Sequence, residues 1–190
     1  MPLHVTRGRR LAGLALVALC AAGVAAQKAP ETFTATASVE KGSARATAPV
    51  TLSITRYATD AERNAIRKAV SDGGTTGARK ALSALSDAGF IQLGDRRTPI
   101  KFAAERPTAG GRLVTILTAT PILFLGAGIP GSKPEARFEV AIALLDLKDG
   151  QNGLGELAPA ATIALDGGGA FVIEDYGEAV IWLNGLGRAR

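Results

Sequence analysis

The chain has 190 residues with 22 basic and 17 acidic side chains, but only one cysteine, one histidine and one methionine. These three residues are Cys20, His4 and Met1, so all of the chain after residue 20 lacks them. A Ser-His-Asp triad, a Cys-His pair, a disulfide and a typical zinc site are therefore excluded there. Carboxylates, Lys, Tyr, Ser and Thr remain as the groups that could act chemically.

The first 26 residues have the pattern of a secretory signal peptide. Arg7, Arg9 and Arg10 precede an apolar run over residues 11–26 that is rich in Ala and Leu and ends in small residues. The run is shorter than the ~20 residues that a membrane span needs. We therefore expect an exported protein, periplasmic or secreted, that is cleaved near Ala26 and is not integral to a membrane once the signal is removed.

Two other interpretations of this segment stay open. A retained membrane anchor would need a longer apolar run. A lipoprotein would be modified at Cys20, but Leu19 stands where such cysteines usually have Gly, Ala or Ser.

Removal of the signal also removes most of the basic surplus. Three of the 22 basic residues and none of the acidic ones lie in it, which leaves 19 basic against 17 acidic side chains. A nucleic-acid-binding domain needs a distinctly basic surface. We therefore expect no nucleic-acid partner.

After a short linker over residues 27–31, the sequence predicts two strands and then two helices. Residues 32–40 and 50–55 alternate apolar with polar side chains, which predicts a hairpin of half-buried strands. Thr59 and Glu62 have the spacing of a capping box that starts a helix. Gly73 and Gly74 stop this run, and a second short helical pattern follows. The result is a helical hairpin after the second strand.

Only strand-like segments follow the helical hairpin. Two of them, 112–118 and 121–125, are apolar at nearly every position, which predicts burial on both faces at the centre of a sheet. The last two, 170–174 and 179–183, have the pattern of a terminal hairpin with Trp182 near its end. The predicted segments are residues 90–93, 99–103, 112–118, 121–125, 138–147, 160–165, 170–174 and 179–183.

Strands that come in adjacent runs, without alternating helices, argue against a doubly wound parallel sheet. We expect a single globular α+β domain over residues 32–187. It would be mainly an antiparallel sheet of eight or nine strands with one helical hairpin inserted after the second strand. A small β-barrel with a helical insertion is the alternative.

Two glycine-rich patterns are similar to nucleotide-binding motifs but lack features that those motifs require. Residues 126–131 have the spacing of a dinucleotide-binding loop, but Pro130 and Pro134 interrupt the helix that must open there. Ser132 and Lys133 stand in the reverse of the order that a phosphate-binding loop requires. We expect no cofactor.

Two further patterns, a Ser-x-x-Lys motif and a calcium-binding loop, also lack the geometry or the ligands that their functions require. Ser38 and Lys41 match the Ser-x-x-Lys motif of penicillin-recognising enzymes, but a strand would place their side chains on opposite faces. A calcium loop that ends on Glu156 would have Leu145 and Leu147 at its first and third positions, where oxygen ligands are required. We expect no metal site.

Glu174, Asp175 and Glu178 are the candidate catalytic residues. They cluster beside Tyr176, and two carboxylates near aromatic rings are typical of glycosidases, in which one acts as acid and the other as base or nucleophile. The competing interpretation is a charged, solvent-exposed turn that joins two strands.

Four segments carry a resemblance to small exported bacterial proteins of unknown function. The resemblance covers most of the chain after the signal and implies no activity, cofactor or partner. The segments are residues 31–35, 59–63, 121–128 and 173–177.

These observations favour an exported, non-catalytic binding or interaction module, whose partner would be an envelope or extracellular protein. The alternative is a carboxylate-dependent hydrolase that acts on an envelope or extracellular polymer. The two hypotheses differ in whether the candidate carboxylates line a cleft or lie in solvent.

Overall fold

The computed structural model describes residues 30–41, 44–122, 136–148, 153–176 and 180–189. These residues form ten strands and one helical segment. The predicted signal peptide and most of the predicted linker lie outside them. The elements are β1 (Glu31–Lys41), β2 (Ala44–Ile54), α1 (Asp60–Ser83), β3 (Gly89–Leu93), β4 (Arg96–Ile100), β5 (Phe102–Thr108), β6 (Gly111–Leu117), β7 (Val140–Lys148), β8 (Gly153–Leu165), β9 (Phe171–Tyr176) and β10 (Ile181–Arg188).

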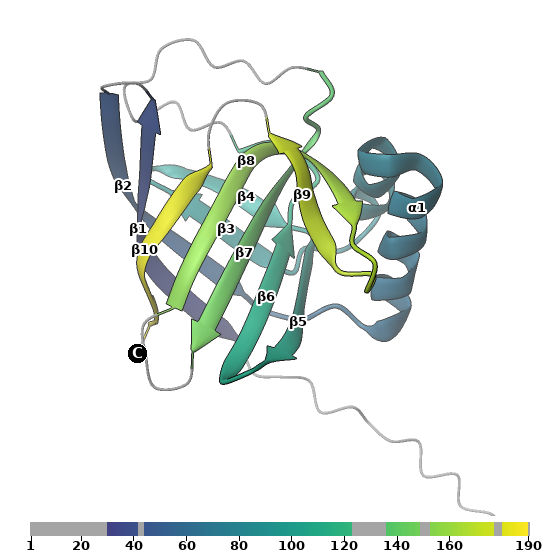
Figure 1. Ribbon diagram of the computed structural model, residues 1–190, viewed down its shortest axis with the longest axis horizontal. Coiled ribbons are helices and arrows are strands. Elements are labelled where there is room, and N and C mark those ends of the chain that lie inside the picture. The colour runs from purple at the N-terminus through teal and green to yellow at the C-terminus, as the bar shows by residue number, and fades with distance from the viewer. Residues whose placement is uncertain (1–29, 42–43, 123–135, 149–152, 177–179, 190) are drawn as a thin grey trace, which may run out of the picture.

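The strands form one antiparallel sheet that curves into a nearly closed barrel (Figure 1). Their order is β4-β3-β2-β1-β10-β8-β7-β6-β5, and β9 pairs with β8 beside this path. Only Lys101 separates β4 from β5, and its N–H donates to the carbonyl of Leu117 in β6 at 3.0 Å. The two ends of the strand order are therefore joined by the chain itself. The predicted α+β fold is confirmed, and the sheet takes the barrel form that was its alternative.

The barrel interior is filled by the apolar positions that alternate along the strands. β1 and β2 pair residue for residue from Glu31 with Ile54 to Lys41 with Ala44, which confirms the predicted hairpin. Alternate side chains of one face are buried because successive residues of a strand point to opposite sides. The largest of the buried interior side chains are Phe33, Leu52, Ile54, Ile91, Ile100, Ile116 and Leu145.

Segment α1 is two helices folded back on each other, as the sequence predicts. Thr59 accepts from the N–H of Glu62 while the Glu62 carboxylate accepts from the N–H of Thr59, so the capping box is present. The helical geometry is interrupted at Gly73 and Gly74, and Gly74 has a φ of 56°, which favours glycine. A Cβ placed on Gly77 would lie 2.3 Å from the carbonyl oxygen of Ala69. The second helix thus packs directly on the backbone of the first.

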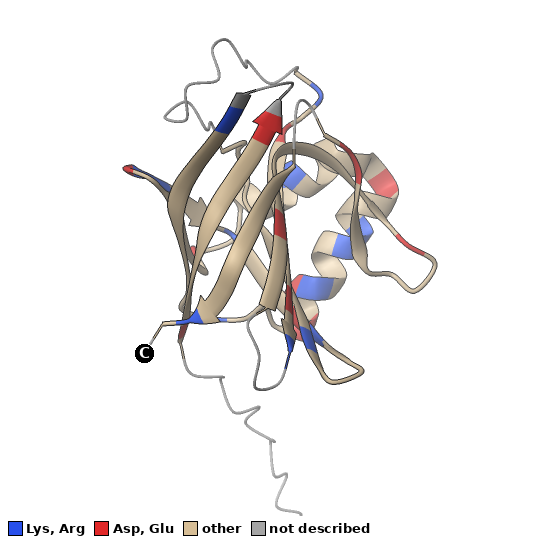
Figure 2. Ribbon diagram, turned by 60° about the vertical axis from the view of Figure 1, so that its left-hand side comes forward, with Lys and Arg blue, Asp and Glu red and all other residues tan. Residues whose placement is uncertain are grey.

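The helical hairpin covers one part of the barrel's outer face (Figure 1). Its buried side chains include Ile66, Val70, Ala78 and Leu82, and they pack on outward-facing residues of β5, β7, β8 and β9. The hydroxyl of Thr75 also accepts the N–H of Ile163 in β8 at 2.9 Å. Figure 2 shows that α1 carries many of the charges, whereas the strands are largely uncharged along their length. The described residues place no further helix on the rest of the outer face.

Several sequence-based boundaries need correction. β10 does not pair with β9, so residues 170–174 and 179–183 do not form a terminal hairpin. Instead β10 lies between β1 and β8, and β9 extends the sheet on the same side of β8. Strand β8 begins at Gly153, in the segment between the predicted strands 138–147 and 160–165. Hydrophobic periodicity locates strands but does not specify their partners.

Three smaller differences concern burial and strand ends. Pro121 and Ile122 lie outside any strand, and the rest of the predicted strand 121–125 is outside the described residues. β6 lies next to the end of the strand order and not at the centre. It is nevertheless buried on both faces, because Ile116 belongs to the interior cluster and Leu117 packs in the cluster beneath α1. Glu31, which we expected in the linker, is the first residue of β1 and is buried.

Candidate ligand-binding face

Strand β10 places the tryptophan of this chain in solvent. Ile181 and Leu183 are buried in the barrel, so Trp182 and Asn184 between and beyond them point outward. Trp182 is 57% exposed, although a ring of this size is usually highly buried. Its neighbours on the adjacent strands therefore define the first candidate site.

The strand register places an acidic and an apolar residue in one row with Trp182. Glu156 of β8 is directly opposite Trp182, and Leu144 of β7 is directly opposite Glu156. On the other side, Ser38 of β1 is opposite Trp182. Directly opposed residues have Cβ atoms about 5 Å apart. The row thus runs from leucine to carboxylate to indole to hydroxyl across four strands.

A second row lies one step along the strands. It contains Leu113 of β6, Asp146 of β7 and Leu154 of β8, which are opposed in that order. Leu154 is 70% exposed. Asp146 is diagonal to Glu156, so the two carboxylates lie in neighbouring rows of one face.

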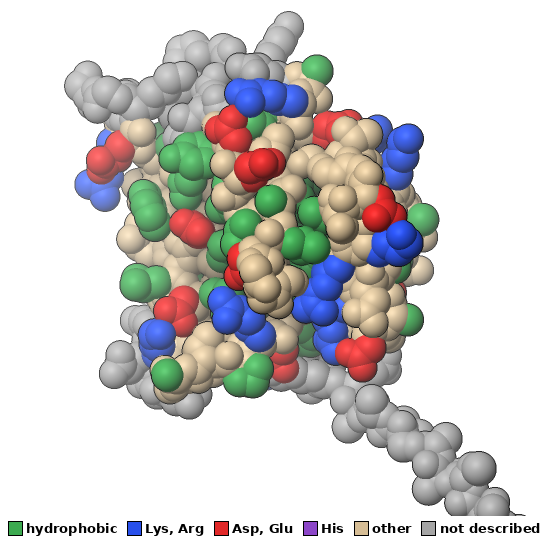
Figure 3. Space-filling view, turned by 45° about the vertical axis from the view of Figure 1, so that its right-hand side comes forward, with side chains coloured by type: hydrophobic (Ala, Val, Ile, Leu, Met, Phe, Trp, Pro, Cys, Tyr) green, Lys and Arg blue, Asp and Glu red, His purple; other side chains and the backbone are tan. Residues whose placement is uncertain are grey.

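These residues line two adjoining grooves. The first has a volume of about 300 Å³ and is lined by the second row, by the members of the first row other than Ser38, and by Gly155, Leu183 and Asn184. The second has a volume of about 680 Å³ and shares Glu156, Trp182 and Asn184 with the first. It extends toward the tip of the β1–β2 hairpin and is lined in addition by Ser38, Glu40, Arg45, Ile173, Tyr176 and Val180. In the space-filling view, hydrophobic side chains with acidic ones among them gather over the strands beside α1 (Figure 3).

The charges in the grooves are unevenly compensated. Asp146 pairs with Lys148 at 2.9 Å, and Glu40 pairs with Arg45 at 3.5 Å. Glu156, which is partly buried, has no ion-pair or hydrogen-bond partner among the described residues. One carboxylate oxygen of Asp146 is also buried without a hydrogen bond. The grooves therefore carry excess negative charge, concentrated beside Trp182.

One hydrogen bond fixes the floor of the larger groove. The side-chain amide of Asn184 donates to the hydroxyl of Ser38 at 2.7 Å. Ser38 is itself only 7% exposed. Its hydroxyl is thus a structural acceptor, and the side chain of Lys41, its partner in the Ser-x-x-Lys pattern, lies outside the described residues.

Of the candidate catalytic residues from the sequence, the two that the structure describes, Glu174 and Asp175, are not among the lining residues of these grooves. Glu174 is exposed on β9, and Asp175 forms an ion pair with Arg137 at 2.8 Å. The pairing of β9 with β8 is irregular at this point, because Ile173 and Asp175 face successive residues of β8 and Glu174 between them has no opposed residue. Glu178 is outside the described residues, as are the glycine-rich patterns at 126–131 and at 132–133.

The described part of the chain contains no group of three or more His, Cys, Asp and Glu side chains that could hold a metal ion. None of its helices is long and apolar enough to pass through a bilayer.

A buried ionic cluster lies at one end of the barrel. The Glu31 side chain is 1% exposed, and Arg112 donates to both of its oxygens, at 3.0 and 2.9 Å. Tyr57 also donates to Glu31, and Arg112 forms a further ion pair with Glu105. Burial raises the pKa of Tyr57 above its ordinary value, and the bond to Glu31 adds to the effect. Since its members satisfy one another, this cluster ties together the ends of β1, β2 and β6.

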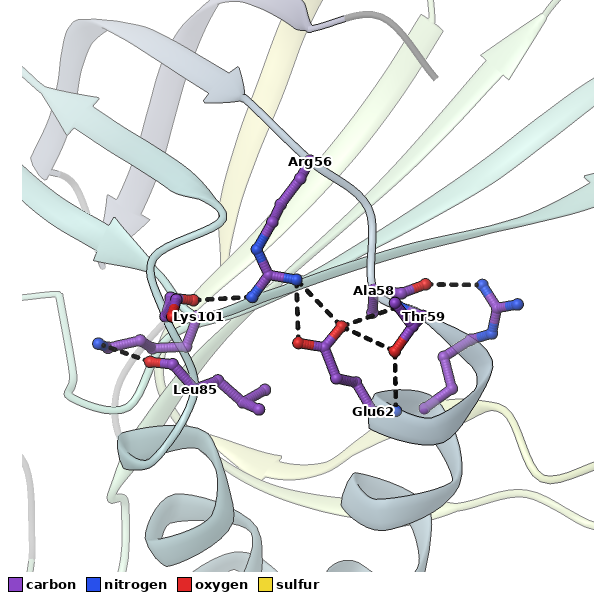
Figure 4. A network of polar contacts seen from close by, with 8 residues as sticks. Arg56, Ala58, Thr59, Glu62, Leu85 and Lys101 are labelled. Carbon is purple, nitrogen blue, oxygen red and sulfur yellow. Dashed lines mark hydrogen bonds and ion pairs between the residues drawn. The ribbon is translucent and has the colours of Figure 1, made fainter. Parts of the chain in front are cut away.

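A second polar network holds the helical hairpin to the barrel (Figure 4). Arg56 donates to both oxygens of Glu62 at 3.0 Å and to the carbonyl of Ser86 at 2.9 Å. Burial acts to raise the pKa of Glu62, but the N–H of Thr59 and the guanidinium of Arg56 outweigh it and hold the pKa below its ordinary value. Lys101 donates to the carbonyl of Leu85 at 3.2 Å. The start and end of α1 are therefore fixed to the same region.

Sequence reasoning noticed Trp182 but missed its neighbours. Glu156 and Leu154 lie between the predicted strands 138–147 and 160–165, and Asp146 lies near the end of the first of them. The local sequence predicts this strand poorly, because residues 153–157 do not alternate apolar with polar side chains and include two glycines, which are depleted in strands.

No protein-family model, curated protein or solved structure matches this chain.

Proposed function

We propose that this protein is an exported, non-catalytic binding module that holds its ligand on the outer face of β6, β7, β8, β10 and β1, around Trp182. The observation that carries the proposal is the pair of adjoining grooves that share Trp182, Glu156 and Asn184. The basic and apolar pattern of residues 1–26 supports export.

The exposed apolar and aromatic side chains on the face around Trp182 favour a ligand there. The outer face beside it is buried beneath α1, whereas Leu154, Trp182 and Tyr176 stay 70%, 57% and 47% exposed. Covering apolar surface releases about 25 cal/mol per Å². Trp and Tyr are also the residues that most often dominate binding energies at interfaces.

The proposal is tested by affinity capture from the envelope fraction of the source cell with three immobilised chains. We expect the wild type to retain a reproducible ligand, and Trp182→Ala to retain at least about thirtyfold less, because losses of 2 kcal/mol or more are typical of such anchors. Leu154→Ala provides a second groove variant that leaves the ring in place.

The matched control is Lys80→Ala, which truncates an exposed side chain near the end of α1. Equal capture by all variants, with unchanged thermal unfolding, would overturn the proposal. Loss of capture by Lys80→Ala alone would place the ligand on α1 instead.

A carboxylate-dependent hydrolase is the second candidate function. The observation that favours it is the diagonal pair Asp146 and Glu156, two carboxylates on the wall of one groove. Glycosidases use two carboxyl groups about 5–10 Å apart. The hydrolase hypothesis predicts that the purified protein releases reducing ends from an envelope polysaccharide and that Glu156→Gln abolishes this release.

A further inference from the structure

We infer that the ligand of this face is an extended basic and apolar segment of a partner protein, with a Lys or Arg side chain held between the ring of Trp182 and the carboxylate of Glu156. This inference rests on the proposed function and names the chemistry that the same grooves select.

The acidic side chains on this face favour the binding of a cation. Among the described residues that line the two grooves, Glu40, Asp146 and Glu156 are acidic and Arg45 is the one basic residue. Arg45 and Lys148 already pair with Glu40 and Asp146. Within the described part of the chain, Glu156 is the groove carboxylate that has no ion-pair or hydrogen-bond partner, and it is the directly opposed neighbour of Trp182. A cation at this point would meet a carboxylate on one side and the negative face of the indole on the other.

The apolar part of the smaller groove favours a ligand in which the cation is attached to an aliphatic chain or lies next to an apolar residue. Leu113, Leu144 and Leu154 form the wall next to Glu156. A polyhydroxylated sugar placed against three leucines would lose hydrogen bonds to water without replacement. The aliphatic stem of a Lys or Arg side chain, or a neighbouring apolar residue, can pack there while the charged end reaches the carboxylate.

The extent of the grooves favours a polypeptide over a small amine. Their lining residues run from Leu113 on β6 to Arg45 on β2, which is five strand spacings in the sheet order. At about 4.8 Å per spacing this path is roughly 24 Å along the surface, the length of about seven extended residues. A single ammonium ligand would occupy only the position between Trp182 and Glu156.

The fluorescence of Trp182, the sole tryptophan of the chain, reports binding directly. The probe is an eight-residue peptide of alternating Lys and Leu, titrated into the purified protein. Its matched control is the same peptide with every lysine acetylated, which keeps the shape and removes the charge. We expect a saturable change in Trp182 emission with the first peptide and at least about tenfold weaker binding with the second.

Glu156→Gln tests the residue that the inference depends on. We expect it to weaken binding of the Lys-Leu peptide by about tenfold. Asp95→Asn removes an exposed carboxylate from the β3–β4 turn, away from the grooves, and is expected to leave binding within about twofold. Unfolding curves of the two variants confirm that both keep the fold.

Three results would overturn the inference. They are equal binding of the acetylated peptide, equal binding by Glu156→Gln, and unchanged Trp182 emission at saturating Lys-Leu peptide. Saturable binding of a neutral glycan in place of the peptide would also reject the cationic ligand, while leaving a binding function of this face intact. The function itself fails only if capture is insensitive to Trp182→Ala and Leu154→Ala.

Discussion

Glu31 is the residue whose environment departs furthest from what its position in the chain suggests. A glutamate side chain that is 1% exposed is rare unless it is paired and hydrogen-bonded. Here Arg112, which is 81 residues away in the chain, supplies two donors, and Tyr57 supplies a third. The sequence shows the charges of Glu31 and Arg112 but not their contact, because that contact depends on how the barrel closes.

Tyr57 makes stability depend on pH in the alkaline range. Its folded-state pKa lies above its ordinary value of 10.0, first because of burial and then because of Glu31. Below pH 10 the tyrosine keeps its proton in both states, so the stabilisation is fully present. As the pH rises further, the unfolded state releases this proton first, and stability is lost at up to about 1.4 kcal/mol per pH unit.

We therefore expect the free energy of unfolding from urea titrations to fall more steeply between pH 10 and pH 11 in the wild type than in Tyr57→Phe. The comparison of slopes cancels the other groups that titrate in this range. Parallel slopes in the two proteins would show that Tyr57 does not carry the effect.

At the scale of elements, the helical hairpin is the part that local sequence specifies best. The capping box at Thr59 and Glu62 and the stop at Gly73-Gly74 are both local signals, and both are confirmed. The position of β10 is not a local property. It depends on which strand edges are free when β1 and β8 have formed, so the pattern at residues 179–183 predicted a strand but the wrong partner.

Gly77→Ala tests whether close contact between the two halves of α1 matters. Its new Cβ would meet the Ala69 carbonyl oxygen at 2.3 Å, so the halves must separate. We expect a loss of about 1–3 kcal/mol in the free energy of unfolding, which is typical of overpacking. Urea denaturation monitored by far-ultraviolet circular dichroism measures it.

Gly73→Ala is the matched control for this substitution. Its Cβ would have no heavy atom within 4 Å, and the φ of Gly73 is −143°, outside the left-handed region that favours glycine. Equal losses for the two variants would mean that the hairpin tolerates no alanine in this region for reasons other than the contact with Ala69.

At the scale of the whole molecule, the outer face of the barrel has two parts that differ in exposure to solvent. One part is buried beneath α1, and the other carries Trp182, Leu154 and Glu156 and is concave. The fold class followed from the alternation of apolar residues and from the single helical region. The grooved face could not be predicted, because its lining residues come from seven strands whose order only the structure gives.

The central claim is that a ligand binds the face around Trp182, and site-specific photo-crosslinking in the source cell tests it most directly. A photoreactive amino acid is placed at Leu154, on the rim of the smaller groove, or at Asn64, which is exposed on α1. The account predicts a defined adduct from position 154 that Glu156→Gln diminishes, and none from position 64. Equal adducts from both positions, or an adduct from position 64 alone, would contradict it.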